Sequence, residues 1–436
     1  MKPLKTFILV ILGFLLLAAP TWAESTEELK AQIEALKRQM AEMQAAMQAQ
    51  IEALQKKLEQ VQSQGVAPQV VAKEARPVFS KKNTEWLLYG KLKTDLTYDT
   101  AKMTYYNDFI GAVANRSRTE NADSGNDSTN FNPRDTRFGF WAAHKEGDWL
   151  VKGRFEMDFY GYNNGNNLIP RMRLAYSDIT NLATKTSLRI GQDWIPVARL
   201  NPSTIDFGIL SAAGNLWWRV PQVTLRQKIN KNWELLLALM KHRRLDPNRE
   251  DRMPWALARV AYSGGLLGPG NMIALGGGYR HASYQAEDSS NVDRWLAVAE
   301  WKFHLLDKRL LFKGEAWFGK GIGESFLRYE LDTREDGKAA WASGGWADVT
   351  WFFAPRWSAT VGLGFDNPSD SDIMKGRTVA DLSDRQFTQN SQYFANVWYQ
   401  LTKPLKVGFE VIHIETERDY QTDVANRFTL SVQYLF

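Results

Sequence analysis

Seven arginines between residues 134 and 226 are the strongest candidates for chemistry in this sequence. They fall on or beside the polar face of alternating segments: Arg134, Arg137, Arg154, Arg171, Arg173, Arg189 and Arg226. A guanidinium group stays charged and presents a planar fork of donors that grips carboxylate or phosphate with two parallel hydrogen bonds. In neighbouring strands these groups would form a ladder that lowers the barrier for anions along one wall of a tube. The alternative is structural, with the arginines paired to Glu156, Asp158, Asp178 and Asp193 within the wall.

Acidic residues occupy the corresponding face of later segments. They are Glu300, Glu315, Asp348, Asp366 and Glu410. If the segments close into a ring, these acids would stand opposite the arginines. We therefore expect an electric field across the lumen.

Other kinds of chemistry find little support. The chain has no cysteine, which excludes thiol catalysis, covalent c-type haem and cysteine-ligated zinc. Its five histidines lack metal-ligand spacing, and the acidic stretch at 366–372 is typical of a solvated loop. No Ser/His/Asp combination indicates an enzyme, so we predict no catalytic, cofactor or metal site. Because the basic residues are interleaved with an apolar face, we also predict no nucleic-acid surface.

The elements that must position the arginines follow a period of two from Glu85 onward. In segments such as 151–159 and 295–303, apolar residues alternate with residues that are mostly charged. A charged face repeated this often cannot lie inside a sandwich, whose inner faces are dry. About sixteen such segments of about 22 residues each fit 85–436. The sequence therefore predicts an all-β membrane fold, an antiparallel transmembrane β-barrel of about sixteen strands in the bacterial outer membrane.

The connections also fit a barrel. Long polar stretches at 115–132 and 366–385 indicate outer loops, and short breaks at 145–148, 229–232 and 401–404 indicate periplasmic hairpins. Tryptophans near strand ends, such as Trp149, Trp233 and Trp357, are typical of interfacial girdles.

One connection, Ile195 to Arg219, is too long and too apolar for an exposed loop. It would either fold back into the lumen and narrow it or pack against a neighbouring subunit.

The final segment alternates apolar and polar residues up to Phe436. We expect Phe436 to face outward at the periplasmic end of a closing strand. Together with Tyr434 and Val432 it resembles the sorting signal that the barrel assembly machinery reads.

The N-terminal region predicts three further segments. Residues 1–23 combine two lysines, a short apolar run and small residues at a cleavage site, as in a secretory signal peptide; an uncleaved inner-membrane anchor is the alternative. Residues 24–64 predict a periplasmic coiled coil, and 65–84 a linker. The heptad seam comprises Leu29, Ile33, Leu36, Met40, Met43 and Met47. A single amphipathic helix lying on another surface would show the same pattern.

Part of the sequence resembles the DcaP-like porin family. The resemblance runs from Arg134 to Gln227 and is carried by "RDTRFGFWAA" (134–143), "KGRFEMDFYG" (152–161), "RMRLAYSDI" (171–179), "RIGQDW" (189–194), "STIDFG" (203–208) and "PQVTLRQ" (221–227). It implies a trimeric sixteen-stranded outer-membrane channel with a periplasmic coiled coil that takes up small organic anions such as dicarboxylates. The family's arginine-lined eyelet would correspond to Arg137, Arg154, Arg171, Arg173 and Arg189. Phosphate-selective porins are a neighbouring family.

Three functions follow from these observations. The first is passive diffusion of small organic anions, the second is phosphate-selective transport, and the third is a structural tether between the outer membrane and peptidoglycan. The expected partners are further copies of the chain in a homotrimer, outer-membrane lipid and lipopolysaccharide, the barrel assembly machinery, small anionic solutes and, for the tether, peptidoglycan.

Overall fold

The computed structural model describes most of residues 79–436. The described residues are 34, 79–81, 83–104, 109–116, 127–161, 168–243, 249–250, 253–284, 291–327, 334, 338–383 and 386–436. The predicted signal peptide, the coiled-coil seam and most of the linker lie outside them. The chain divides into two compact units, 1–66 and 67–436, and the second contains every described strand.

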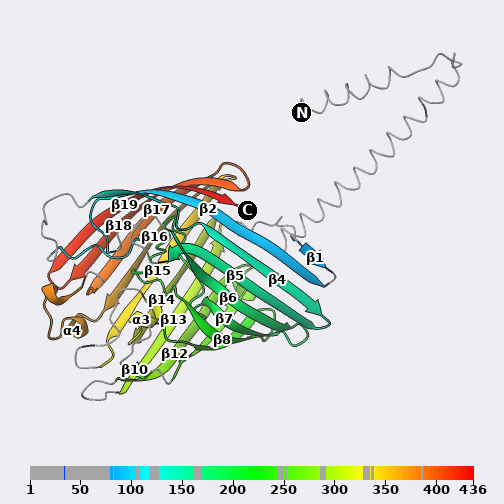
Figure 1. Cartoon of the computed structure of the whole chain (residues 1–436), viewed down its shortest axis with the longest axis horizontal. Coiled ribbons are helices and arrows are strands. Elements are labelled where there is room, and N and C mark those ends of the chain that lie inside the picture. Colours follow the sequence, from blue (N-terminus) through cyan, green and yellow to red (C-terminus); the bar gives the residue numbers. More distant parts are fainter. Residues whose placement is uncertain are drawn as a thin grey trace, which may run out of the picture. The chain divides into compact units, whose positions relative to one another are not determined.

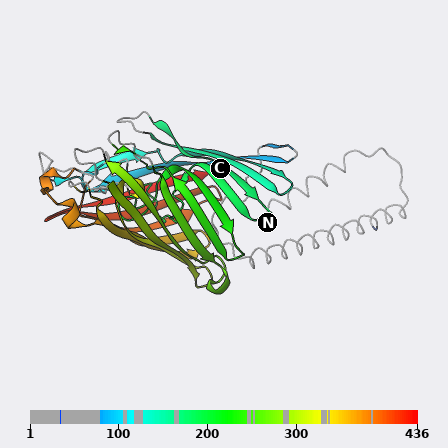
Figure 2. The same cartoon turned by 90° about the horizontal axis from the view of Figure 1, so that it is seen from below.

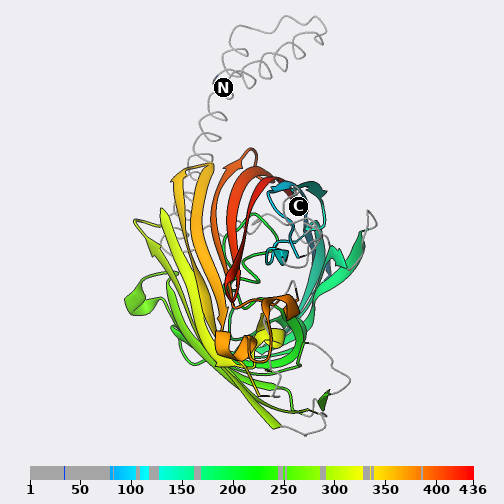
Figure 3. The same cartoon turned by 90° about the vertical axis from the view of Figure 1, so that its left-hand side faces the viewer.

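The described strands form one closed antiparallel barrel (Figures 1 and 2). The last strand, β19 (Gln421–Leu435), pairs with the first long strand, β2 (Thr84–Asp99), and this pairing closes the ring (Figure 3). β3 (Ser128–Asn132) and β4 (Arg137–Glu146) share one position beside β2. The described part of the chain therefore supplies sixteen strand positions, which confirms the predicted antiparallel barrel of about sixteen strands.

The other elements alternate in direction around the ring. The strands are β1 (Phe79–Lys81), β5 (Trp149–Gly161), β6 (Ile169–Asn181), β7 (Thr186–Trp194), β8 (Arg219–Lys228), β9 (Trp233–Met240), β10 (Arg249–Glu250), β11 (Trp255–Ser263), β12 (Met272–Tyr284), β13 (Asn291–Leu305), β14 (Leu310–Lys320), β15 (Trp341–Ala354), β16 (Trp357–Pro368), β17 (Gln389–Gln400) and β18 (Leu405–Arg418). The short helices are η2 (Gly265–Leu267), α3 (Gly323–Phe326), α4 (Asp370–Ile373) and η3 (Val379–Asp381). In the described part of the chain, no helix has both the length and the apolar character needed to cross a membrane.

The alternation in the sequence sets which side chains face the lumen. On β2, Lys93 and Asp95 point inward and are buried, whereas Leu92, which precedes Lys93, points outward and is exposed. Trp149 and Trp357, near strand ends, also face outward and are exposed. A pleated strand places successive side chains on opposite faces, so the polar face lines the interior and the apolar face suits lipid.

Short turns join the strands at one end of the barrel and longer connections at the other. The predicted hairpins at 145–148, 229–232 and 401–404 are confirmed, and we call their end the turn end. Gly147 lies in the first of these turns with φ +54°, a conformation that glycine adopts without strain. The described parts of the predicted outer loops, 115–116, 127–132 and 366–383, lie at the opposite end, which we call the loop end.

Phe436 completes the closure of the barrel at the turn end. The backbone N–H of Gly90 donates to the carbonyl oxygen of Phe436 at 3.0 Å, and the N–H of Phe436 donates back to Gly90 at 3.2 Å. Its ring lies 5.9 Å from that of Phe138, on the outer face, and Tyr434 and Val432 are exposed on the same face. The expectation that the last residue points outward is therefore confirmed, and its role in sorting stays a prediction.

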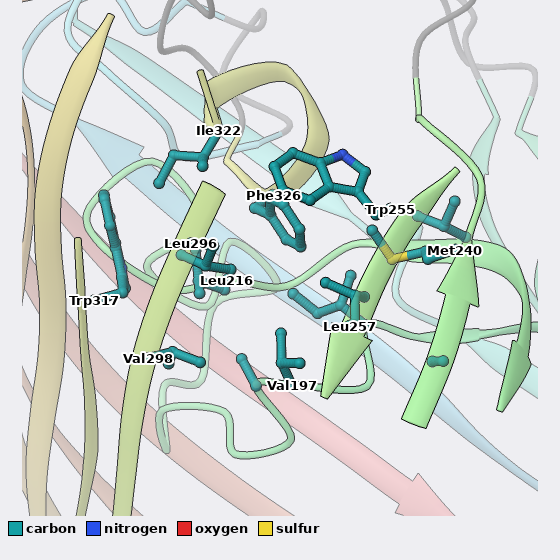
Figure 4. Close-up of a cluster of buried hydrophobic side chains, with 14 of the residues drawn as sticks. Val197, Leu216, Met240, Trp255, Leu257, Leu296, Val298, Trp317, Ile322 and Phe326 are labelled. Carbon is teal, nitrogen blue, oxygen red and sulfur yellow. The ribbon is translucent and has the colours of Figure 1, made fainter. Parts of the chain in front are cut away.

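An apolar core fills one side of the lumen (Figure 4). Val197 and Leu216, from the connection between β7 and β8, pack with the inward-facing Leu257 and Trp317 of the barrel wall. Phe326 of α3 joins them from the loop end. This core lies against the loop-end half of β8 and against strands from β9 to β15, so β4 to β7 and the turn-end half of β8 line the polar part of the interior.

Candidate functional site: the lumen and its constriction

The connection 195–218, which we call the constriction loop, crosses the lumen (Figure 3, green). Four carboxylates of the far wall hold it by accepting hydrogen bonds from its backbone N–H groups: Arg199 and Leu200 to Glu300 (2.6 and 2.9 Å), Ser203 to Asp348 (2.6 Å), Ile205 and Asp206 to Glu410 (both 2.7 Å), and Leu216 to Glu315 (2.7 Å). Hydrogen bonds to a charged acceptor are about twice as strong as neutral ones. These hydrogen bonds therefore fix the constriction loop inside the lumen.

These contacts correct the expected role of the acids. Glu300, Glu315, Asp348 and Glu410 lie on the inner face as predicted, but each is at most 1% exposed because the constriction loop covers it. Asp366 is buried as well. The acids hold the loop and do not form an open acidic wall opposite the arginines.

The apex of the loop is also tied to the seam of the barrel. Asp206 accepts a hydrogen bond from Arg427 Nη1 at 2.9 Å, and Arg427 donates two more to Asp99 at 2.6 and 2.7 Å. Lys93 Nζ donates to the carbonyl oxygen of Ile205 at 2.8 Å. Since Asp99 and Arg427 belong to the two strands that close the ring, loop position and barrel closure depend on the same ion pairs.

A close backbone contact seats the second half of the loop. Gly214 has φ +90°, and a Cβ atom added there would lie 2.3 Å from the carbonyl oxygens of Gly345 and Phe365. Trp317 Nε1 donates to the carbonyl oxygen of Gly214 at 2.6 Å. Only glycine permits this approach. The sequence left two places open for this segment, the lumen and the interface with a neighbouring subunit. The structure shows it in the lumen and not on the outer face.

Three of the predicted arginines surround the loop apex. Arg137 pairs with Asp135 at 2.8 Å, and Arg171 donates two hydrogen bonds to Asp158 at 3.0 and 2.8 Å. Arg173 bridges Asp158 and Glu156, both at 2.7 Å. Arg137 and Arg171 remain partly exposed, at 27% and 28% of their side chains, so they can reach a solute.

Of the other four predicted arginines, three lie toward the turn end and one, Arg134, is buried. Arg154, Arg189 and Arg226 lie toward the turn end, where Arg154 pairs with Glu156 and Arg189 with both Asp178 and Asp193. Arg226 lies 3.9 Å from Glu234. Arg134 is buried, as is Arg173, so neither presents its guanidinium to the open lumen. The structure thus brings six of the seven onto one wall, β4 to β8, but most are engaged by acids.

An aromatic cluster sits directly on the arginine wall. Phe207 of the constriction loop stacks on Tyr160 of β5, with ring centroids 4.0 Å apart and planes 15° apart. The guanidinium carbons of Arg137, Arg171 and Arg173 lie 5.7–5.9 Å from the Phe207 centroid. Phe207 lines the same pocket of the lumen as Arg137, although its packed ring is only 4% exposed. No pattern along the chain indicates this position, because Tyr160 and the three arginines lie tens of residues away from Phe207 in the sequence.

Removing this ring should widen the passage. We expect Phe207→Ala to raise single-channel conductance by roughly half, because the narrowest part of a pore limits its current. Replacing this buried ring by alanine costs about 3–5 kcal/mol, so insertion of the variant into the bilayer must first show that the barrel has folded. Conductance steps in a planar bilayer measure the effect.

Phe318→Ala is the matched control, because Phe318 faces outward and is exposed. This variant should keep the original conductance. Unchanged steps in Phe207→Ala would show that the ring does not limit the passage.

Basic residues outside the predicted set also face the lumen. The guanidinium carbon of Arg219 lies 4.8 Å from the ring centroid of Trp194 and 5.4 Å from that of Trp217, and no acidic side chain lies within 4.0 Å of it in the described residues. Lys152 and Lys228 lie on the inner face nearer the turn end. The alternation of the sequence predicts that Lys152 and Lys228 lie on the polar face. That Arg219 has no acidic partner among the described residues could be seen only in the fold. The described residues contain no group of three or more side chains suited to a metal ion.

Comparison with solved structures shows the porin fold. The outer-membrane channel DcaP of Acinetobacter baumannii is similar to this chain, with a TM-score of 0.69, 21% identity, and coverage of 83% of this chain and 99% of DcaP. The anion-selective porin from Comamonas acidovorans has a TM-score of 0.57, 9% identity, and coverage of 81% and 100%. OmpT of Vibrio cholerae, in its trimer form, has a TM-score of 0.51, 12% identity, and the same coverage as the Comamonas porin. No protein-family model and no curated protein sequence matches the chain.

Proposed function

We propose that this chain is an outer-membrane porin, a passive diffusion channel that prefers small organic anions such as dicarboxylates. The observation that carries the proposal is the charge of strands β5 to β8. These four strands contain eight basic and only four acidic residues, and they face the part of the lumen that the apolar core leaves polar. Such a surplus beside a narrow passage lowers the energy of an anion and raises that of a cation.

The constriction loop adds to this positive environment. Desolvation, together with the positive charges of Arg226 and Arg259, lowers the pKa of Arg199 to about 10. Burial is the largest cause, and only the part contributed by Arg226 and Arg259 reflects the positive charge around the loop. Arg171, with its fork of donors, is suited to a carboxylate, because planar guanidinium and carboxylate groups form two parallel hydrogen bonds.

The likeness to outer-membrane porins supports the remaining parts of the proposal. We place the barrel in the outer membrane with its turn end toward the periplasm. We also propose that the chain carries a signal peptide at 1–23 and a periplasmic coiled coil at 24–64, and that it assembles as a homotrimer. One similar structure, OmpT of Vibrio cholerae, is described as a trimer, and a heptad seam suits self-association.

The ion preference of the purified protein tests the proposal. In a planar bilayer with a potassium chloride gradient, we expect a reversal potential that shows chloride to be more permeant than potassium. A cation preference would refute anion selection, and the absence of conductance steps would refute the channel itself. Flux of dicarboxylates into liposomes, compared with uncharged solutes of equal size, tests the solute class.

A further inference from the structure

Two residues in the constriction loop have a left-handed backbone conformation that their side chains disfavour. Ile209 has φ +43° and Leu210 has φ +54°, and we call them the strained pair. A Cβ atom in this region crowds the following carbonyl oxygen, which disfavours the conformation about tenfold for each residue. Because neither residue is a glycine, contacts with neighbouring groups must hold the strained pair in place.

Asn215 makes hydrogen bonds to both members of the strained pair. Its side-chain Nδ2 donates to the carbonyl oxygen of Ile209 at 2.7 Å, and its backbone N–H donates to the carbonyl oxygen of Leu210 at 3.2 Å. Nδ2 also donates to Oδ1 of Asn201, in the first half of the loop, at 3.3 Å. Asn215 is fully buried, so these hydrogen bonds form away from bulk water, where they are hard to replace.

The turn that contains the strained pair, residues 207–213, is fixed to the barrel wall at both ends, and we call it the apex turn. Before it, Glu410 accepts two hydrogen bonds from backbone N–H groups of the loop. After it, Gly214 approaches the backbone of Gly345 so closely that no Cβ atom would fit. A shift of the whole loop therefore cannot relieve the strain, and relief must move the residues of the apex turn itself.

The apex turn carries side chains that line the lumen. Phe207 and Ile209 contribute, with Arg137 of the wall, to one pocket of about 330 Å³. Phe207 begins the apex turn, and Ile209 is the first residue of the strained pair. The backbone conformation of the strained pair therefore sets where both side chains lie in the passage.

We propose that Asn215 is a positioning residue for the constriction, which holds the apex turn in its strained conformation and whose release gives the channel a second conductance level. The inference rests on the proposed function, because it requires a conducting channel. In the released state the strained pair returns to negative φ, and Phe207 leaves its stack on Tyr160. Strain favours the released state and the hydrogen bonds of Asn215 favour the held state, so their balance sets the two populations.

Single-channel recording of the full-length protein in a planar bilayer tests this balance. N215A removes the side-chain hydrogen bonds and should raise the fraction of time at the second level about tenfold. I209G should lower that fraction about tenfold, because glycine adopts positive φ without strain. The double variant I209G/N215A should therefore return close to the gating of the original protein. A loss of packing alone would not be rescued by removing a second side chain.

L306G and N271A are the matched controls, because both positions lie in turns at the turn end. Leu306 has φ +48°, and Asn271 Nδ2 donates to the carbonyl oxygen of Leu267, so each control removes the same kind of feature away from the constriction. Both variants should gate as the original protein does.

Unchanged gating in N215A, or a second level in N215A that I209G does not suppress, would overturn the role of Asn215 while the chloride preference of the channel remains. Should N215A fail to insert, I209G/N215A decides in its place: insertion with the original gating supports the role, and failure to insert overturns it. Cation preference in the original protein would overturn the proposed anion selection alone, whereas the absence of conductance steps would overturn both proposals.

Discussion

R137Q/R171Q should lose most of the anion preference while it keeps the barrel. Both side chains are partly exposed beside Phe207, where the passage is narrow. A unit charge about 5 Å from a passing ion contributes about 0.8 kcal/mol even in water, which is about fourfold in relative permeability for each arginine. The reversal potential in a salt gradient measures the change.

This pair is chosen because each acid keeps another basic partner. Asp135 still contacts Lys91 and Lys93, and Asp158 still contacts Arg173. Replacing Arg173 would instead leave buried carboxylates short of a partner, which costs several kcal/mol and confuses selectivity with folding.

R309Q/R356Q is the matched control, because both arginines are exposed in turns outside the lumen. Equal permeability ratios in the original protein, the control and R137Q/R171Q would show that Arg137 and Arg171 have only a structural role. An equal change in the control and in R137Q/R171Q would show that net charge, and not the constriction, sets the preference.

Glu410→Gln should release the apex of the constriction loop. Glu410 accepts hydrogen bonds from the N–H groups of Ile205 and Asp206, both at 2.7 Å, and from Asn396 Nδ2 at 2.8 Å. A glutamine offers one acceptor and points a donor at the remaining N–H, so at least one buried N–H loses its partner. Each such loss costs about 1–3 kcal/mol. We expect larger and noisier single-channel currents and a lower unfolding temperature in detergent.

Glu415→Gln is the control on the same strand, because Glu415 lies beside His413 on the outer face and is 38% exposed. It should leave conductance, noise and unfolding temperature unchanged. Quiet currents of the original size from Glu410→Gln would mean that the other three carboxylates hold the loop without it.

The strands and their two faces could be predicted from the alternation of residues along the chain. Period-two alternation is a local property, since each side chain points opposite to its neighbours whatever the rest of the chain does. The same alternation placed Phe436 on the outer face, and the polar breaks placed the turns. For this reason the sixteen-strand barrel and the inner position of the arginines on β5 to β8 could be predicted before any contact was known.

The contacts that the inner face makes could not be predicted in this way, because they depend on how the whole chain folds. Glu300 and Glu410 were predicted to oppose the arginines, yet they hold backbone groups about 100 and 205 residues away along the chain. Phe207 reached Tyr160 only because that loop folds inward. Arg173 is paired with acidic side chains, whereas Lys152 has no acidic side chain within 4.0 Å among the described residues. Which of these holds for a basic group depends on its neighbours from other strands. The net charge of a site depends on which residues lie close together in the folded protein. The spacing of residues along the chain does not show which residues these are.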